Sequence, residues 1–195
     1  TYTYDGLRRL IGTEIDPIKN NGEKEFLSYQ YDPVGNRMES ASLHGLSTST
    51  PTDGYVKSYT YNAANQLLTV ETDSVKKNPN INMLTSYTYD PNGNRINKES
   101  VDANDKNALV EGFDYTFDPE NRMVQALAYQ LGGKDKSNRT DRHVTDLEYD
   151  GGGRRLVKSY DPKFNGAPGV DKRVEYVFDG LDPVAEYAML NGQRD

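Results

Sequence analysis

Pairs of aromatic residues separated by one polar residue recur along the chain, and a short polar turn directly follows each pair. In Tyr87-Thr88-Tyr89 the rings alternate with a threonine, so an extended strand would carry both rings on one face. The next residues, Asp90-Pro91-Asn92-Gly93, have the composition of a reverse turn, because Pro restricts the backbone at the second position. Arg95 and Ile96 then begin a returning strand. The pattern predicts a β-hairpin with one aromatic face.

The same pattern occurs seven times, at intervals of 27 to 32 residues. The repeats begin near residues 2, 29, 59, 87, 115, 147 and 176. Their paired positions are Tyr2/Tyr4, Tyr29/Tyr31, Tyr59/Tyr61, Tyr87/Tyr89, Tyr115/Phe117, Leu147/Tyr149 and Tyr176/Phe178. Thirteen of these fourteen positions are aromatic, and they hold 13 of the 20 aromatic residues of the chain, so the periodicity is a true internal repeat.

A hairpin loop of three or four residues brings specific residues opposite each other across the two strands. We expect the second aromatic residue of each repeat to face an aliphatic residue, a favourable pair on a sheet surface. The expected pairs are Tyr4 with Leu10, Tyr31 with Met38, Tyr61 with Leu67, Tyr89 with Ile96, Phe117 with Met123, Tyr149 with Leu156 and Phe178 with Val184.

The same counting predicts a pair of opposite charges beside most turns. The expected pairs are Asp5 with Arg9, Asp32 with Arg37, Asp90 with Arg95, Asp118 with Arg122 and Asp150 with Arg155, with the neutral pair Asn62 and Gln66 in the third repeat. Gly93 in the fourth turn and Asp179 in the seventh complete the residues that we assign to the structural repeat.

These elements predict an all-β fold, an antiparallel meander of repeated β-hairpins with two strands per repeat. About fourteen strands are more than a flat open sheet usually holds, so we expect a coiled strip. Residues 126–131 are the one window with a doubtful helical period, and they are equally compatible with a strand. Polar stretches lie roughly midway between the hairpins and predict irregular loops.

Composition narrows the classes of function. Apolar residues make up 34% of the chain, charged residues 27%, and the mean hydropathy is −0.87, which suits a thin sheet better than a thick core. A net charge of −7 argues against a nucleic-acid partner, and no apolar run reaches the ~20 residues that span a membrane as a helix. The absence of Cys excludes disulfides, thiol nucleophiles and thiolate metal sites.

We assign no catalytic, cofactor-binding or metal-binding residue. Asp90, Asn92 and Asn94 resemble the start of a calcium loop, but Arg95 stands where such a loop needs glycine, so we assign these residues to a turn. The many carboxylates are better explained as turn residues than as catalytic acids. The chain is therefore expected not to be an enzyme and to bind no cofactor.

A few residues lie outside the repeat pattern. His44 and His143 have neither metal-ligand nor triad spacing, and we expect both to be surface or loop histidines. Tyr55, Tyr129 and Tyr160 are not part of the aromatic pairs, so they are the tyrosines to test for ligand binding.

Several copies closely resemble the tyrosine–aspartate (YD) repeats of the RHS family. The matching stretches are Tyr-Thr-Tyr-Asp-Pro-Asn-Gly-Asn-Arg at 87–95, Tyr-Gln-Tyr-Asp-Pro-Val-Gly-Asn-Arg at 29–37 and Tyr-Thr-Phe-Asp-Pro-Glu-Asn-Arg at 115–122. Residues 176–187 resemble the last repeats before the RHS core region, whose autoproteolytic aspartyl site would lie beyond Asp195. The resemblance covers essentially the whole chain, so we expect residues 1–195 to be a single YD-repeat segment of a longer protein.

The resemblance implies a β-strip that spirals into a hollow shell. In bacterial RHS proteins and in the C component of insecticidal toxin complexes such a shell encloses a C-terminal toxin, and teneurins use related repeats in adhesion. It implies a non-enzymatic shell segment, secreted or on a bacterial cell surface, whose partners are neighbouring repeats and an enclosed cargo polypeptide. Two alternatives stay open: an extracellular binding or adhesion module for a glycan or protein receptor, and a filament subunit that self-assembles through unpaired strand edges.

Overall fold

The computed structural model consists of β-strands joined by short turns, and the residues that it describes include no helix. It describes residues 1–16, 24–45, 51–75, 82–105, 110–132, 138–161, 163–164, 167–168, 172–180, 182–190 and 193–194. The irregular loops expected between the hairpins lie mostly outside these ranges.

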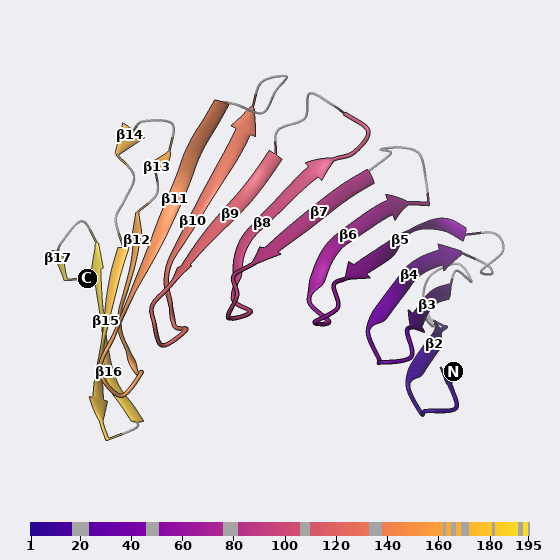
Figure 1. Cartoon of the computed structure of the whole chain (residues 1–195), viewed down its shortest axis with the longest axis horizontal. Coiled ribbons are helices and arrows are strands. Elements are labelled where there is room, and N and C mark those ends of the chain that lie inside the picture. The colour runs from indigo at the N-terminus through magenta and orange to yellow at the C-terminus, as the bar shows by residue number, and fades with distance from the viewer. Residues whose placement is uncertain are drawn as a thin grey trace. The chain divides into compact units, whose positions relative to one another are not determined.

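The strands follow the repeat pattern closely, and each aromatic pair lies at the end of a strand that leads into a tight turn (Figure 1). Their bounds are β1 (Tyr2–Tyr4), β2 (Leu10–Ile15), β3 (Lys24–Tyr31), β4 (Arg37–Gly45), β5 (Pro51–Tyr61), β6 (Leu67–Ser74), β7 (Asn82–Tyr89), β8 (Arg95–Asp102), β9 (Val110–Phe117), β10 (Met123–Gly132), β11 (Asn138–Tyr149), β12 (Arg155–Asp161), β13 (Lys163–Phe164), β14 (Ala167–Pro168), β15 (Lys172–Asp179), β16 (Asp182–Leu190) and β17 (Gln193–Arg194). Residues 126–131 belong to β10 and are therefore a strand.

The sheet is an antiparallel meander. Across the described residues the hydrogen-bonded order runs from β1 to β12 and then through β15, β16 and β17, while β13 and β14 form a separate two-stranded sheet. The prediction of an all-β antiparallel meander of hairpins is confirmed.

The chain divides into two compact units. The first contains Thr1–Tyr87 with Ser100–Lys106, and the second contains Thr88–Glu99 with Asn107–Asp195. The expectation that residues 1–195 form one YD-repeat segment stays a prediction.

In the first unit the paired aromatic residues share one face of the sheet. Tyr29 in β3 lies opposite Ser40 in β4, and Ser40 lies opposite Lys57 in β5. Opposed residues point to the same side, and residues two apart on a strand do so as well. The side chain of Tyr59 therefore stands on the same face as that of Tyr29.

The second unit repeats this arrangement. Tyr115 in β9 lies opposite Ala126 in β10, and Ala126 lies opposite Thr145 in β11. Thr145 is four residues from Tyr149 on the same strand, so the two aromatic residues share a face. Within each unit the sequence period of two has therefore fixed the aromatic face correctly.

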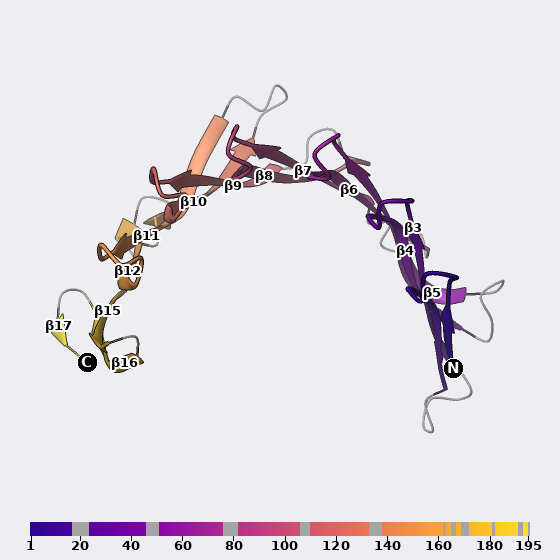
Figure 2. The same cartoon turned by 60° about the horizontal axis from the view of Figure 1, so that its bottom comes forward.

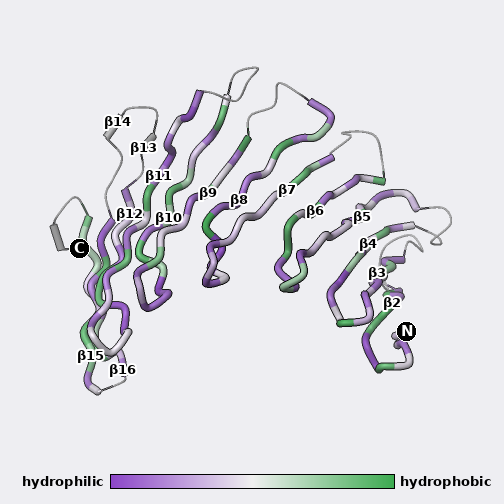
Figure 3. Tube along the Cα trace, viewed as in Figure 1, coloured by the Kyte–Doolittle hydropathy of each residue, from purple (hydrophilic) through white to green (hydrophobic). Residues whose placement is uncertain are grey.

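Each unit is one layer thick, with strands side by side and both faces open (Figure 2). Apolar and polar residues alternate along the strands without gathering in a central cluster (Figure 3). Only six apolar residues of the described chain are buried, namely Ala41, Val110, Ala128, Tyr129, Leu147 and Val157. The stability of the sheet must therefore come largely from contacts between neighbouring strands and turns.

Candidate functional site

Six tight turns share one backbone geometry, and we call them together the turn edge. They span residues 5–9, 32–36, 62–66, 90–94, 118–122 and 150–154. In each turn the N–H of the first residue donates to the carbonyl of the fifth at 2.9–3.0 Å, and the N–H of the fourth donates to the carbonyl of the first at 3.0–3.2 Å. The fourth residue always has positive φ, and this position is held by Arg8, Gly35, Asn65, Gly93, Asn121 and Gly153. The turn thus needs Gly, or a residue such as Asn that tolerates the left-handed region.

The first side chain of each turn organises the loop. In the fifth turn Asp118 Oδ1 accepts the backbone N–H groups of Glu120 and Arg122, at 3.0 and 2.9 Å, and Oδ2 accepts Arg122 Nε at 2.6 Å. Arg9 and Arg154 bind Asp5 and Asp150 in the same way. The charged fifth residue thus locks the carboxylate that already holds the loop.

Three turns use an amide in place of the arginine. Asn36 Nδ2 donates to Asp32 Oδ2 at 2.9 Å, and Asn94 Nδ2 donates to Asp90 Oδ2 at 3.0 Å. In the third turn the direction is reversed, and Asn62 Nδ2 donates to Gln66 Oε1 at 2.7 Å. The predicted neutral pair in this turn is confirmed.

The partner of the first residue is always four positions along the chain. The predicted ion pairs of Asp5 with Arg9 and of Asp118 with Arg122 are confirmed. The other three predicted pairs are wrong, because the partner stands one residue earlier. The corrected pairs are Asp32 with Asn36 instead of Arg37, Asp90 with Asn94 instead of Arg95, and Asp150 with Arg154 instead of Arg155.

The aromatic pairs show the same displacement. Those of Tyr4 with Leu10, Tyr61 with Leu67 and Phe117 with Met123 are confirmed. Three others are wrong, since Tyr31 faces Arg37 instead of Met38, Tyr149 faces Arg155 instead of Leu156, and Phe178 faces Pro183 instead of Val184. The pair of Tyr89 with Ile96 stays a prediction.

The errors in the second and sixth hairpins come from the assumed loop length, because the turn has five residues in each of the six cases and not one more there. A β-bulge follows the turn in correctly and wrongly predicted hairpins alike. In each hairpin whose register is described, one residue of the returning strand is skipped just after the turn. The skipped residues are Ile11, Met38, Leu68, Val124, Leu156 and Val184, all of them aliphatic. The fifth residue of each turn, counted with the initial Asp or Asn as the first, is always Arg, Asn or Gln. This pattern in the sequence would have revealed that the turn length is constant.

Three arginines that were predicted to form ion pairs, Arg37, Arg95 and Arg155, lie over aromatic rings instead. The guanidinium carbon of Arg37 lies 4.8 Å from the ring centre of Tyr29. Arg95 and Arg155 lie 5.0 Å from the rings of Tyr115 and Tyr176. These distances are typical of cation–π contacts. The seventh hairpin departs from the pattern: Asp179 pairs with Asp182, and Gly180 between them has positive φ.

Contacts between successive turns link the hairpins. Arg9 Nη1 donates to the carbonyl of Asp32 at 3.0 Å, and Arg122 Nη1 donates to that of Asp150 at 3.0 Å. Arg154 donates to the carbonyl of Gly180 in the same way. The amide-ended turns reach across differently, since Asn36 donates to Asn65 at 2.9 Å and Asn94 to Asn121 at 2.8 Å.

Rings and hydroxyls strengthen these links. Arg9 and Arg122 lie 4.8 and 5.1 Å from the rings of Tyr31 and Tyr149 in the following repeat. In return, the Tyr31 hydroxyl donates to the carbonyl of Leu10 at 3.1 Å. Tyr61 and Tyr149 donate in the same way to the carbonyls of Arg37 and Met123, each at 2.9 Å. The paired tyrosines therefore join one hairpin to the preceding one.

The turn carboxylates have lowered pKa values. Hydrogen bonds from the backbone and side chain of Arg9 lower the pKa of Asp5, and those of Arg154 lower that of Asp150. The Asn94 side chain has the main effect on Asp90. For Asp32 and Asp118 partial desolvation raises the pKa, but the hydrogen bonds that hold the loop outweigh it.

A polar network crosses four strands of the second unit, and we call it the Tyr129 cluster (Asn97, Glu99, Asp114, Tyr129 and Arg139). The Tyr129 hydroxyl donates to Glu99 Oε1 at 2.7 Å and accepts Asn97 Nδ2 at 2.7 Å. Arg139 lies 3.9 Å from the Tyr129 ring centre and binds Asp114 at 2.8 Å. Burial, aided by Glu99, raises the pKa of Tyr129 to about 12. Its phenol is therefore a neutral structural donor at physiological pH.

Gly112 creates the space that Tyr129 occupies. The two residues face each other across β9 and β10, and a Cβ atom at Gly112 would lie 2.2 Å from the Tyr129 ring. The ring is 3% exposed, which places it among the most buried side chains of the described residues. The Tyr129 ring is therefore part of the packing of the sheet.

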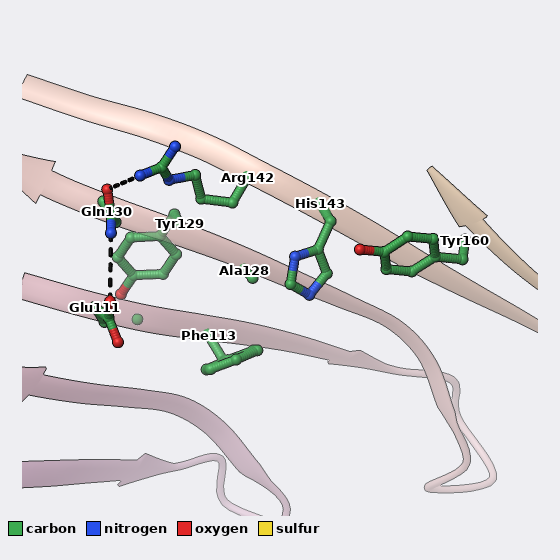
Figure 4. Close-up of a pocket in the computed structure, with 9 residues that line it drawn as sticks. Glu111, Phe113, Ala128, Tyr129, Gln130, Arg142, His143 and Tyr160 are labelled. Atoms are coloured by element: carbon green, nitrogen blue, oxygen red, sulfur yellow. Dashed lines mark hydrogen bonds between the residues drawn. The ribbon is translucent and has the colours of Figure 1, made fainter. Parts of the chain in front are cut away.

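A cavity of about 350 Å³ opens at the same strands, and we call it the aromatic cleft (Figure 4). Its apolar part consists mainly of Phe113, Ala128, His143 and Tyr160, and its polar part of Glu111, Gln130 and Arg142. Gly112 and Tyr129 also contribute to the lining. The Phe113 and His143 ring centres are 6.2 Å apart in an edge-on arrangement, and His143 lies 5.2 Å from Tyr160.

The polar part of the cleft is a connected row. Arg142 is the extra residue of a bulge in β11, and it donates to Gln130 Oε1. Gln130 Nε2 in turn donates to Glu111 Oε1 at 3.4 Å. A bulge redirects the side chain that it carries, so Arg142 reaches the cleft face.

Sequence reasoning located this cleft only in part. Tyr129 and Tyr160 line it, whereas Tyr55 lies in the first unit and is 42% exposed. Neither histidine lies in a loop: His44 is an exposed residue of β4, as expected of a surface position, and His143 lies half-buried on β11, where it lines the cleft. One signal was available: Phe113 extends the alternation of Tyr115 and Phe117 to three rings.

Within the described residues, no three His, Cys, Asp or Glu side chains are grouped so that they could hold a metal ion. A search of the same residues for a helix long and apolar enough to cross a membrane found none.

Comparison with known proteins gives structural neighbours only. No family model and no curated protein match the chain. The crystal structure of TcdB2-TccC3-TEV is similar over 97% of this chain, with 16% identity and a TM-score of 0.41. The Tc holotoxin pore of Photorhabdus luminescens is similar over 98%, with 17% identity and a TM-score of 0.43. A porin-like protein from Bacteroides uniformis is similar over 85% of this chain and 58% of its own, with 10% identity and a TM-score of 0.40.

The chain spans 12% of the length of each of the two toxin chains. Chains of the Tc toxin are thus among its structural neighbours. Because identities and TM-scores are low, we base the proposals below on the repeat motif and on the contacts of the turns.

Proposed function

We propose that the chain is a non-enzymatic structural segment of an RHS-type β-sheet shell that encloses a cargo polypeptide. The observation that supports this proposal most directly is the chain of turn-to-turn contacts, such as that of Arg9 with the carbonyl of Asp32. Within each unit, turn side chains join successive turns, and several tyrosine hydroxyls join a hairpin to the one before it. A strip held in this way extends by repetition and needs no central core.

The single layer suits a wall. Few apolar side chains are buried, so most residues of each unit contribute to surface area. In three turns the carboxylate is matched by an arginine of the same turn, as Asp118 is by Arg122 at 2.6 Å, which limits the repulsion between stacked turns. A polar, net acidic wall would isolate a cargo by exclusion, without a specific site for it.

The partners of this segment are the neighbouring repeats of a longer chain and the enclosed polypeptide. We place the protein outside the cytoplasm, secreted or at the cell surface of a bacterium, where RHS-type shells deliver their contents. The coiling of the strip into a hollow wall belongs to the same proposal.

Electron microscopy of the native, longer protein tests the proposal together with limited proteolysis. We expect hollow particles and a cargo that is digested many times more slowly inside the particle than when free. Fibres, a native chain of only about 21.9 kDa, or a cargo digested at the free rate would overturn it.

A variant in the turns tests whether the contacts between turns contribute to the protection of the cargo. The triple substitution Arg9→Ala, Arg122→Ala and Arg154→Ala removes three links between turns, and we expect faster digestion of the cargo. Lys158→Ala, at an exposed position on β12, is the matched control and should leave protection unchanged. Equal protection in both variants would show that the turn contacts do not hold the wall together.

A further inference from the structure

We propose that the aromatic cleft binds a pyranose ring of a neutral saccharide. The cleft combines a face of aromatic rings with a row of planar polar side chains. This binding activity would be separate from the shell function, because it requires only the second unit.

The aromatic side of the cleft matches one face of a sugar ring. The C–H bonds on that face carry a small positive charge and pack well against the negative face of an aromatic ring. Phe113 and Tyr160 are half-buried residues on β9 and β12, with His143 between them on β11. Ala128 is only 5% exposed, and its small side chain leaves room above the sheet where a larger residue would fill the cleft.

The polar side of the cleft matches hydroxyl groups. A carboxylate only accepts hydrogen bonds, a guanidinium only donates them, and an amide does both. Glu111, Arg142 and Gln130 supply one of each, in a connected row. A hydroxyl group donates and accepts as well, so it can join this row at either end.

Charge and size narrow the ligand class. The row contains one negative and one positive side chain, so an uncharged ligand needs no compensating partner. Lys98 Nζ lies 5.8 Å from the Phe113 ring centre and is engaged with its face. A volume of about 350 Å³ is near the lower end for small-molecule sites, so the cleft accommodates one sugar ring while the rest of an oligosaccharide stays in solvent.

An apolar side chain of a peptide fits the cleft less well. It would cover Glu111, Gln130 and Arg142 without offering them hydrogen bonds, and polar groups buried without partners cost free energy. We therefore choose a saccharide, and binding of an aromatic peptide is an outcome that would contradict the proposal.

Titration calorimetry and NMR of the 195-residue chain test the proposal. The probes are neutral oligosaccharides of glucose, galactose, mannose and N-acetylglucosamine, sialyllactose as an acidic saccharide, and a short Phe-containing peptide. We expect at least one neutral saccharide to bind and to shift the ring signals of Phe113 and His143. The proposal is overturned if no neutral saccharide binds at about 10 mM, or if only the acidic saccharide or the peptide binds.

Two variants separate ring stacking from loss of the fold. Phe113→Leu keeps an apolar side chain but removes the ring, and we expect it to weaken saccharide binding about tenfold. Glu111→Gln keeps the shape but changes one acceptor into an amide, and we expect a smaller loss. Tyr55→Ala, an exposed tyrosine of the first unit, is the matched control and should bind as the parent does. Equal affinities of Phe113→Leu and the parent would overturn the assignment of the cleft.

Discussion

The turn edge and the aromatic cleft both belong to repeated β-hairpins, but the turn edge follows the repeat and the cleft departs from it. At the turn edge the backbone bonds recur almost unchanged in six turns, and the fifth residue is always arginine, asparagine or glutamine. The cleft and the Tyr129 cluster occur once among the described residues, and each depends on a local departure such as Gly112 or the bulge at Arg142. Repeated features therefore build the scaffold, and exceptions to the repeat create the candidate binding site.

Gly112→Ala should have the largest effect on stability, and it acts on the Tyr129 cluster. A Cβ atom there would overlap the Tyr129 ring at 2.2 Å, so the ring must leave its network. We expect the free energy of unfolding in urea to fall by about 3 kcal/mol, as overpacking and loss of hydrogen bonds combine. Gly6→Ala is the control, because nothing lies within 4 Å of its Cβ position, and an equal loss there would refute this explanation.

Tyr129→Phe removes only the hydroxyl group and so separates its hydrogen bonds from the packing of the ring. Glu99 and Asn97 lose their shared partner while the ring stays in place over Gly112. We expect a loss of about 2 kcal/mol in the free energy of unfolding, typical of a hydrogen bond to a charged group. Tyr55→Phe at an exposed site should change stability little. A change of similar size in both variants would indicate that the network adds nothing.

Substitutions at the fourth position of the turns should lower the free energy of unfolding in one turn and raise it in another. Gly35 has φ +102°, so Gly35→Ala should lower the free energy of unfolding by about 1 kcal/mol. Arg8 has φ 62° at the equivalent position, so Arg8→Gly should raise it by about 1 kcal/mol. Opposite signs in thermal or urea unfolding would confirm that one geometry governs both turns. Equal signs would contradict it.

The turn edge and the Tyr129 cluster should lose stability at opposite ends of the pH scale. The effect of the turn carboxylates should be small, because the turns are in contact with solvent. The turn carboxylates have lowered pKa values when folded, so their stabilisation is present above the ordinary Asp value of about 3.9 and is lost as the pH falls through the lower folded values. The raised pKa of Tyr129, about 12, has the opposite consequence. Its stabilising effect is present below about pH 10 and is lost as the pH rises from there towards 12.

Urea midpoints between pH 2 and 7 would measure the acid effect, and tyrosine absorbance would follow the alkaline one. Asp118→Asn should reduce the acid dependence, because the amide cannot be protonated in this range. Asn62 already stands at this position in the third turn, so the chain tolerates the exchange. An unchanged acid dependence in Asp118→Asn would show that this carboxylate is not responsible.

The amino-acid sequence predicted more of the fold than of the site. The alternation of Tyr115 and Phe117 and the turn residues Asp90 to Gly93 were sufficient to predict hairpins with one aromatic face. They were not sufficient for the register, because loops of three and of four residues both fit the residue types, whereas the turn has one constant length. Met38 and Leu156 look like strand partners in the sequence but are skipped in the pairing. Arginines assigned to ion pairs consequently lie over rings instead.

The sequence by itself determined the repeat, the turns and the aromatic face, because each follows from neighbours within about ten residues. Only the tertiary structure decided that the turns are linked to one another and that Phe113, Ala128 and Tyr160 meet in a cleft. Those residues come from separate strands, so their meeting depends on register across several hydrogen-bonded pairs. A shift of one residue in any of these pairs would move a side chain to the other face of the sheet.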